Sequence, residues 1–550
     1  MKALRFAFIS VLLSMFVSCN DSKIKQPAGI TGLTDDVHFE QQGEIQSIGM
    51  IEHCELLLQE ATESNADDTE LIKYLQEQLD EAEEYQESLI KEAGANYDPW
   101  MEGSDGMGAK NRAMGYQFAT IRYRSIDHKG NPIMLSTLVV WPYNNIFPNP
   151  DADNVIIGCH VTYGSNAERP TNYNMNSIKS DVGMLAICAK SNFLGASSEN
   201  LVIIPDYQGY GATHGDIHPY LSQELTARQV LDGVRAGIEY YREKHNLEKG
   251  WRSVSAGYSQ GGSVAMAVHR YIEKNNLESE FNFAGSVCGN GPYDPIATLQ
   301  TYLKMETYGR VYMPVSAAMM MYSMCNTNPR LMGKYSPGDF MTKEFLDSDI
   351  ITMIEAKDKD TDMMQAELLE YSASDHEEPD GKFYMERKAT DGFFYPYTND
   401  TKDQHDWAPG YIKTAYASPT QILERNTHDY FSYSGNSYEI KQYPERYAHA
   451  KVLWSALEDN VLHRDWKPAH PIFLYHTEED EVVVYQNFTR CLDAWIDSDY
   501  VKGTIYKGRT YTHVSYGTVF YLFHCRSAIS AILNNETNEY PFLRKLNGDW

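Results

Sequence analysis

The most constraining feature of this 550-residue sequence is the pentapeptide Gly257-Tyr258-Ser259-Gln260-Gly261. Residues 254–257 are typical of the end of a buried strand, and residues 262–274 have the pattern of a helix rich in small residues. A strand that turns sharply into a helix has no room for side chains at Gly257 and Gly261, and it lifts the Ser259 hydroxyl above the strand ends. The pattern therefore predicts a reactive serine beside a helix N-terminus, which favours developing negative charge.

Short apolar runs alternate with helical patterns on both sides of this pentapeptide. Strands of the buried type are predicted at 155–159, 201–204 and 283–288, with a helix at 227–243 between them. Two strands at 119–125 and 133–141 come before, and two at 471–475 and 503–507 come after, followed by a helix at about 518–533. Such alternation predicts an α/β fold with a mostly parallel central sheet and helices on both faces.

The rhythm is interrupted once, which suggests how the chain is divided. Residues 292–450 are rich in Met, Tyr and charge, and we interpret them as a mainly helical cap or lid inserted into a core formed by 115–291 and 451–550. Residues 20–114 are expected to be a polar tether followed by a helical N-terminal segment. In that segment Asp67 and Glu70 form a capping box and Gly94 ends the helical run.

The first 19 residues have the pattern of an export signal. Lys2 and Arg5 precede an apolar run at 6–17 that is short for a membrane span, and the run ends at Ser18-Cys19. This ending is similar to a bacterial lipobox, where the signal is cut before a cysteine that then carries lipid. We therefore expect an exported lipoprotein that is anchored through Cys19 to the outer membrane, on its periplasmic or its surface side. The alternative is an ordinary secretory signal with a chance cysteine.

Charge and cysteine spacing exclude other classes of function. The chain has 47 Lys and Arg against 76 Asp and Glu, a net charge of −29, which argues against nucleic acid as a partner because phosphate binding needs basic side chains. None of the 8 cysteines forms a CxxC pair or has metal-site spacing with histidine. We expect no metal and no cofactor.

A serine nucleophile needs a base that is oriented by an acid, and sharp turns of this kind are followed along the chain by the acid and then by the histidine. An apolar strand runs into Glu478-Glu479-Asp480-Glu481. Asp480 is the predicted acid, because the valines that follow return the chain into packing. Glu478 and Glu479 are its rivals and are expected to be solvated.

His513 is the predicted base. It lies between the last predicted strand and the last predicted helix, in a loop from which an imidazole can reach Ser259. His524 falls inside the helix and is expected to pack. The remaining downstream candidates precede Asp480 and break the expected order; they are His463, His470 and His476.

The reaction of a serine nucleophile also needs hydrogen-bond donors for the oxyanion. One donor is predicted to be the backbone N–H of Gln260. The other is expected from the loop after residue 159, where Val161 is the first choice and Thr162 the second. His160 is interpreted as a residue that orients this loop.

With these residues in view, the chain resembles the secretory-lipase and acyl-esterase branch of the α/β-hydrolases, in particular lipoprotein versions from Gram-negative gut-type bacteria. The resemblance covers about 118 to 530 and rests on several motifs: 123–127 with Gly130, 160–162, 205–211, 218–221, 230–236, 257–262, 456–460, 465–468 and 471–480. It departs at Thr477 and Val484, where Gly and Pro are common, and neither change removes a catalytic group. The helical segment before 95 lies outside it.

This resemblance implies a serine hydrolase that cleaves carboxylic esters through an acyl-enzyme, acting on a small-molecule or glycan-linked ester. One alternative is a serine peptidase on the same fold. Such peptidases often carry a large N-terminal propeller, for which residues 20–115 are too few. The other alternative is a surface lipoprotein that binds glycan or protein without catalysis, for which an intact Ser259, Asp480 and His513 would have no use.

Overall fold

The structure is a computed structural model of the whole chain. It describes residues 39–45, 73, 76, 115–143, 151–172, 181–189, 199–243, 245–304, 313–374, 385–388, 394–396, 411–414, 422–478, 480, 482–506, 513–535 and 537. The segment 1–38, which contains Cys19, lies outside these residues, and so do the predicted helix cap at Asp67 and the helix end at Gly94.

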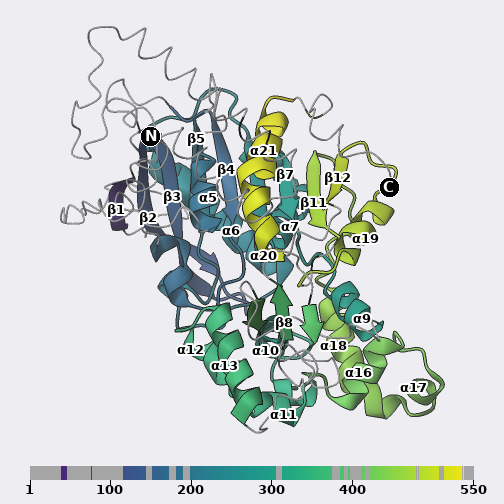
Figure 1. Cartoon of the computed structure of the whole chain (residues 1–550). Helices are drawn as coiled ribbons and strands as arrows, with labels where there is room; N and C mark the ends of the chain where they lie inside the picture. Colours follow the sequence, from purple (N-terminus) through teal and green to yellow (C-terminus); the bar gives the residue numbers. More distant parts are fainter. Residues whose placement is uncertain are drawn as a thin grey trace, which may run out of the picture.

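A nine-stranded sheet in the order β1-β2-β3-β5-β4-β6-β7-β11-β12 forms the centre of the molecule (Figure 1). Three neighbouring pairs at one side of the sheet are antiparallel: β1 with β2, β2 with β3, and β3 with β5. All the other neighbouring pairs, from β5 across to β12, are parallel. The strands are β1 (Phe39–Ile45), β2 (Gly115–Ile126), β3 (Pro132–Tyr143), β4 (Asn154–Cys159), β5 (Asn200–Pro205), β6 (Ser253–Tyr258), β7 (Phe283–Gly289), β11 (Ile472–Thr477) and β12 (Val501–Tyr506). This mostly parallel sheet confirms the predicted fold class.

Helices cover both faces of the sheet, and its central strands β5, β6 and β7 are accordingly buried along their whole length. Helices α6 and α7 pack side by side behind the sheet in Figure 1, and α21 crosses in front of it. The core helices are α5 (Asp181–Ile187), α6 (Gln223–Arg242), α7 (Gln260–Lys274), α8 (Glu278–Phe281), α19 (Gln486–Ala494), α20 (His513–Val519) and α21 (Arg526–Leu533), with a π-helix at Phe520–Cys525 and 3-10 turns at Asn166–Glu168, Pro170–Asn172 and Gly211–Thr213.

The inserted segment packs below the carboxyl ends of the parallel strands (Figure 1). Where it is described it is mainly helical, with a small antiparallel sheet in the order β10-β8-β9. Its elements are α9 (Pro295–Lys304), α10 (Pro314–Thr327), α11 (Lys343–Leu346), α12 (Ile350–Ala356), α13 (Thr361–Ser374), β8 (Met385–Lys388), β9 (Phe394–Pro396), β10 (Tyr411–Thr414), α16 (Arg425–Ser432), α17 (Tyr438–Gln442) and α18 (Ala448–Glu458), with 3-10 turns at Pro337–Asp339 and Pro444–Tyr447.

The cap has its own hydrophobic cluster, rich in methionine, which is separate from the cluster around the large sheet. Leu453, Leu457 and Val461 belong to the cap cluster. Packing of the cap therefore continues beyond residue 450, to the turn that follows α18.

Two sequence predictions need correction. Residues 39–45 were expected to be in the tether and helical segment, but they form β1, which pairs antiparallel with β2 at the sheet edge. Pairing with β2 at the edge of the sheet therefore outweighs the helical and polar pattern of the local sequence. The last helix was expected to begin a few residues after His513, but α20 begins at His513 itself.

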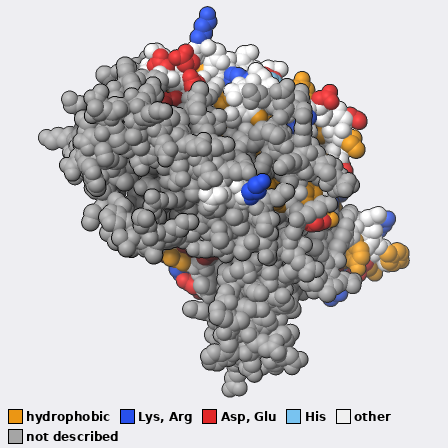
Figure 2. Space-filling view, turned by 45° about the horizontal axis from the view of Figure 1, so that its top comes forward, with side chains coloured by type: hydrophobic (Ala, Val, Ile, Leu, Met, Phe, Trp, Pro, Cys, Tyr) orange, Lys and Arg blue, Asp and Glu red, His pale blue; other side chains and the backbone are white. Residues whose placement is uncertain are grey.

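Figure 2 shows one face of the molecule. Where described side chains are visible on it, the basic ones stand apart and do not gather into a patch. Within the described part of the chain, no helix has both the length and the apolar character needed to cross a bilayer.

Candidate active site

Ser259 lies at the sharp turn between β6 and α7. Its backbone has φ 55° and ψ −125°, a conformation that non-glycine residues rarely adopt and that is common where strain serves a site. A Cβ on Gly257 would lie 2.4 Å from the carbonyl oxygen of Cys159, and one on Gly261 would lie 2.0 Å from the same atom. Both positions therefore exclude any side chain, as the pentapeptide predicted.

The structure brings Ser259, His513 and Asp480 into one hydrogen-bonded chain. Ser259 Oγ lies 2.9 Å from His513 Nε2, and His513 Nδ1 lies 2.7 Å from Asp480 Oδ2. With a proton on Nδ1 donated to the carboxylate, Nε2 is left as the acceptor for the serine hydroxyl. Because Asp480 follows β11 and His513 begins α20, the three side chains come from separate elements at the carboxyl edge of the sheet.

Asp480 is held by more than the imidazole. Its Oδ1 accepts hydrogen bonds from the backbone N–H groups of Val482 and Val483, at 2.9 and 2.6 Å, and its Oδ2 accepts one from Asn290 Nδ2 at 2.5 Å. Burial acts to raise the pKa of Asp480, but His513 and the Val483 N–H outweigh burial and hold that pKa below its usual value. Asp480 is therefore ionised at neutral pH. Asn290 had not been predicted, since nothing local in the sequence links it to Asp480.

Tyr258 fixes the backbone of the histidine. Its hydroxyl donates a 2.7 Å hydrogen bond to the carbonyl oxygen of His513, and its ring packs 5.2 Å from the imidazole, centroid to centroid. The residue between the glycine and the serine of the pentapeptide thus positions the histidine that meets that serine.

The rival residues lie elsewhere. His524 is buried and stacks on Tyr475, and desolvation lowers its pKa to about 3. His463 bonds Asp294 at 3.1 Å, and His470 bonds Glu273 at 2.7 Å. His476 is buried against the carbonyl of the next residue, and Glu478 is exposed, while Glu479 lies outside the described residues.

One of the predicted oxyanion donors is hydrogen-bonded to another residue in the structure. The N–H of Val161 donates a 2.8 Å hydrogen bond to Asp181 Oδ2 at the start of α5. This N–H is therefore already hydrogen-bonded in the structure, and the identity of the second donor stays a prediction. Sequence reasoning could not see this, because Asp181 lies twenty residues further along the chain and meets the loop only in the fold. Thr162, the second choice, lines the cavity beside Ser259.

The side chain of Gln260 is hydrogen-bonded to His218. Its amide Nε2 lies 2.9 Å from His218 Nε2, and His218 Nδ1 lies 2.8 Å from the carbonyl oxygen of Gln208. Desolvation lowers the pKa of His218 to about 4, so the ring is neutral and can donate from Nδ1 while accepting at Nε2. The residue after the serine is thus anchored to the loop that follows β5.

His160 is in the place expected for a residue that orients the loop. Its ring stacks between Tyr163 and Tyr207, with centroid distances of 4.3 and 3.7 Å. Desolvation lowers its pKa to about 3, which leaves it uncharged.

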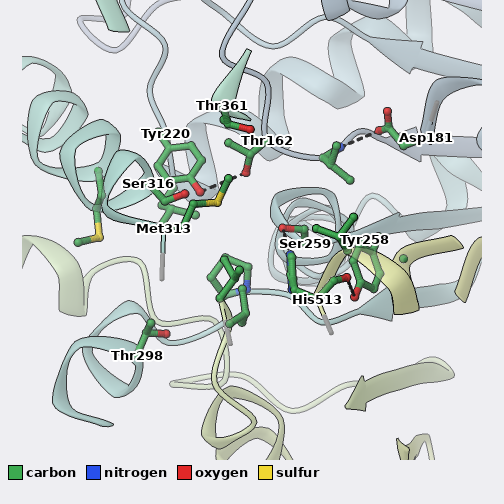
Figure 3. Close-up of a pocket in the computed structure, with 18 of the residues that line it drawn as sticks. Thr162, Asp181, Tyr220, Tyr258, Ser259, Thr298, Met313, Ser316, Thr361 and His513 are labelled. Carbon is green, nitrogen blue, oxygen red and sulfur yellow. Dashed lines mark hydrogen bonds between the residues drawn. The ribbon is translucent and has the colours of Figure 1, made fainter. Parts of the chain in front are cut away.

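Ser259 opens into a cavity of about 360 Å³ between the core and the cap (Figure 3). The size is within the usual range of small-molecule sites. Figure 3 shows Ser259, His513 and Tyr258 on one side, with Thr162, Tyr220, Ser316 and Met313 across from them. Most of the lining is apolar, from both parts of the molecule: Val161, Met184, Leu221, Pro292, Pro295, Leu299, Met313, Ala317, Met320, Val482, Val483 and Val514.

The cavity also has acidic groups. Asp181 is partly buried, and desolvation raises its pKa although Tyr163 and Val161 donate hydrogen bonds to it. Burial likewise raises the pKa of Glu168 to about 7. Asp362 is the third carboxyl in the lining, and the described lining residues include no Lys or Arg.

One group of metal-ligating side chains lies together in the described part of the chain: His269, Glu273 and His470. It lies at the end of α7 that is away from Ser259. Glu273 Oε1 is 2.9 Å from His269 Nε2 and 2.7 Å from His470 Nδ1, and Oε2 accepts a hydrogen bond from Trp466 Nε1. These contacts satisfy the carboxylate and tie α7 to the segment before β11.

Comparison with known proteins gives likeness of structure only, since no protein-family description and no curated protein sequence matches this chain. The rice cell wall degrading esterase LipA from Xanthomonas oryzae aligns with a TM-score of 0.53 and 17% identity, over 78% of this chain and 93% of its own. A candidate hydrolase from Legionella pneumophila aligns with a TM-score of 0.50 and 16% identity, over 80% and 91%. Candida antarctica lipase A in its closed state has a TM-score of 0.46 and 12% identity, over 76% and 78%.

At such identities the likeness establishes the fold alone. The sheet order, the serine turn at its carboxyl edge and the cap above it agree with that likeness. The chain therefore has the α/β-hydrolase fold, which it shares with the esterase from Xanthomonas oryzae.

Proposed function

We propose that this protein is a serine hydrolase that cleaves carboxylic esters, with Ser259 as nucleophile, His513 as general base and acid, and Asp480 as the orienting acid. The observation that carries the proposal is the continuous contact from Ser259 Oγ through His513 to Asp480, at 2.9 and 2.7 Å. A serine hydroxyl is a poor nucleophile unless a base of this kind removes its proton. The cavity above Ser259 gives a substrate access to it.

The proposed reaction has two steps. His513 Nε2 takes the hydroxyl proton as Ser259 Oγ attacks the ester carbonyl, and the same proton then goes to the leaving alcohol as the acyl-enzyme forms. In the second step His513 takes a proton from water, the hydroxide attacks the acyl-enzyme, and the proton returns to Ser259 as the acid departs. Asp480 stabilises the imidazolium in both steps.

The oxyanion of each tetrahedral intermediate needs donors that are already in place. We assign one to the backbone N–H of Gln260, at the first turn of α7, where the helix N-terminus also favours negative charge. We assign the other to Thr162, since the N–H of Val161 is bonded to Asp181.

The substrate proposed is a small-molecule or glycan-linked ester. The largely apolar cavity suits an uncharged ester better than a charged one. The esterase from Xanthomonas oryzae is described as degrading rice cell walls. For this chain a glycan-linked ester is a proposal, and turnover of acetylated xylo-oligosaccharides tests it.

The proposal is tested by comparing ester with peptide turnover. The full chain and its Ser259→Ala variant are assayed on p-nitrophenyl esters from acetyl to palmitoyl, on acetylated xylo-oligosaccharides and on peptide p-nitroanilides. We expect turnover of esters by the wild type, loss of at least about a thousandfold in the variant, and little turnover of anilides. Turnover of anilides over esters would support the peptidase alternative instead, and no turnover of either would refute the proposed function.

We also propose that the protein is exported and anchored to the outer membrane through a lipid on Cys19. What supports this is the sequence of the first 19 residues alone. In a Gram-negative host, a membrane-bound form that becomes soluble on Cys19→Ala substitution is the expected result. Release of the wild-type protein as a soluble chain that begins elsewhere would refute it.

A further inference from the structure

Two cap helices each present one face to the active-site cavity. From α10 and the residue before it, Met313, Ser316, Ala317 and Met320 line the cavity, at the spacing of a single helix face. From α9, the residues Pro295, Thr298 and Leu299 do the same. The wall of the cavity opposite Ser259 is therefore made of helix faces rather than loops, and its side chains are fixed in order along each helix.

One side of the cavity lies beside His513, and the alcohol portion of an ester has to bind there. The leaving alcohol receives its proton from His513 Nε2, so the alcohol portion of the ester has to lie beside His513. Val482, Val483 and Val514 line the cavity, and we place them on that side because they are sequence neighbours of Asp480 and His513.

The wall formed by α10 belongs to the other side. Thr162 Oγ1 lies 3.2 Å from the Tyr220 hydroxyl, and that hydroxyl also bonds Ser316 of α10. Figure 3 shows Thr162, Tyr220, Ser316 and Met313 grouped together, away from His513. An ester whose carbonyl oxygen points to Gln260 and Thr162, and whose alcohol lies at His513, extends its acyl chain towards α10.

We propose that the face of α10 is the acyl-binding wall, that Ala317 and Met320 determine the length of the acyl group, and that the site takes esters of uncharged, apolar acyl groups. This proposal rests on the proposed esterase function. Ala317 and Met320 are the apolar residues of α10 in the wall, and Met320, with its flexible thioether, lines the cavity one turn further along the helix. The carboxyls of Glu168, Asp181 and Asp362 in the same lining disfavour an acyl group that ends in a carboxylate.

The chain offers a matched control at the adjacent residue. Met319 and Met320 are both buried, at 4% and 6% exposed, and both lie in the cap cluster. Met320 lines the active-site cavity, whereas Met319 lines a second cavity of about 180 Å³ between the cap and the loop around Ile217. Replacing either one by alanine removes the same atoms from the same helix, but only one replacement enlarges the active-site cavity.

The test measures kcat/KM on p-nitrophenyl acetate, butyrate, octanoate and decanoate for the wild type, Met320→Ala, Met319→Ala and Ala317→Leu. We expect Met320→Ala to shift the preference towards the longer acyl groups by about tenfold, and Ala317→Leu to shift it towards acetate by a similar factor. Met319→Ala should leave the acyl profile of the wild type unchanged. If Met320→Ala and Met319→Ala have the same profile, or if Ala317→Leu leaves the preference unaltered, the assignment of the acyl wall is wrong.

Two further comparisons separate the parts of the proposal. Ethyl, butyl and hexyl acetate vary only the alcohol, and Met320→Ala should not change the preference among them; a shift there would place the alcohol, not the acyl group, against α10. p-Nitrophenyl hemisuccinate should be turned over at least about tenfold more slowly than the butyrate, and equal rates would overturn the selection of uncharged acyl groups. Ester turnover that depends on Ser259 but shows none of these effects would leave the proposed function standing and refute only this inference.

Discussion

The backbone N–H of Val161 donates to Asp181 Oδ2 at 2.8 Å, and the Tyr163 hydroxyl donates to Asp181 Oδ1 at 2.5 Å. One carboxylate thus fixes the loop after β4 at two points, on either side of Thr162. Because Thr162 is the proposed second oxyanion donor, Asp181 acts as a positioning residue for it rather than as a donor itself.

Replacement of Asp181 tests this relationship. Asp181→Ala leaves the Val161 N–H without its acceptor and should lower kcat by about tenfold with little change in KM, because a misplaced oxyanion donor affects the transition state most. A trifluoromethyl ketone inhibitor, which forms the tetrahedral adduct, should lose affinity by a similar factor. Asp181→Asn keeps an acceptor oxygen and should restore most of the activity. If both variants lose stability equally while kcat and inhibitor affinity stay unchanged, Asp181 has a role in folding only.

Asn290 offers a second test, on the acid side of the site. Its Nδ2 donates to the same Asp480 oxygen that meets His513. Since Asn290 has a positive φ of 39°, Asn290→Gly removes the amide without straining the backbone. The loss of a donor should raise the pKa of Asp480, lower kcat by about tenfold and move the acidic limb of the kcat/KM profile to higher pH. An unchanged pH profile would show that Asn290 does not support Asp480.

Asp294 lies at the junction between cap and core, and it should make the stability of the protein depend on pH. Burial acts to raise the pKa of Asp294, but His463, the Ala297 N–H and Arg490 outweigh it and lower that pKa to about 2. The ordinary pKa of an aspartate is 3.8, so this carboxylate stabilises the fold above about pH 4, and the contribution is lost as the pH falls towards 2. The expected contribution to the free energy of unfolding is about 2 kcal/mol.

Urea unfolding of wild type and Asp294→Asn at pH 6 and pH 3 measures this contribution. The variant should be less stable at pH 6 and should lose less stability between the two pH values than the wild type does. Asp347→Asn, at an exposed ion pair with Lys343, serves as the control and should change little. A variant with the same pH dependence as the wild type would contradict the assigned pKa.

The serine turn itself predicts a steric effect. A Cβ at Gly261 would lie 2.0 Å from the Cys159 carbonyl oxygen, so Gly261→Ala should displace β4 or the turn, lower the yield of folded protein and abolish ester turnover. Gly215→Ala is the matched control, because nothing lies within 4 Å of the added atom and no positive φ is required there. Similar activity in the two variants, measured on folded protein, would contradict the close packing of the turn.

Much of the fold could be predicted because its strands are buried on both faces. Strands β4 and β5 contain short apolar runs, β7 is mostly small and apolar residues, and the turn between β6 and α7 has a local sequence requirement at Gly257 and Gly261. Strand β1 could not be predicted in the same way, since it lies at the edge of the sheet and its pairing with β2 is a contact across the chain.

In the site too, residues with a local sequence pattern could be predicted, and contacts between distant parts of the chain could not. Asp480 and His513 each follow a recognisable strand or precede a helix, and chain order selected them from several acidic and histidine candidates. Asp181 and Asn290 carry no local pattern that links them to the site. Val161 was expected to face the serine, and only the position of α5 reveals that its N–H has another acceptor.

Covalent labelling measures whether Ser259 is an activated nucleophile. The full chain is treated with a fluorophosphonate, and the modified peptide is identified by mass spectrometry. We expect one equivalent of label on Ser259, loss of label in Ser259→Ala, and labelling slowed by at least about a hundredfold in His513→Ala, which retains the serine but not its base. Labelling at another residue, or labelling of Ser259 at the same rate without His513, would show that His513 does not activate Ser259 as a nucleophile.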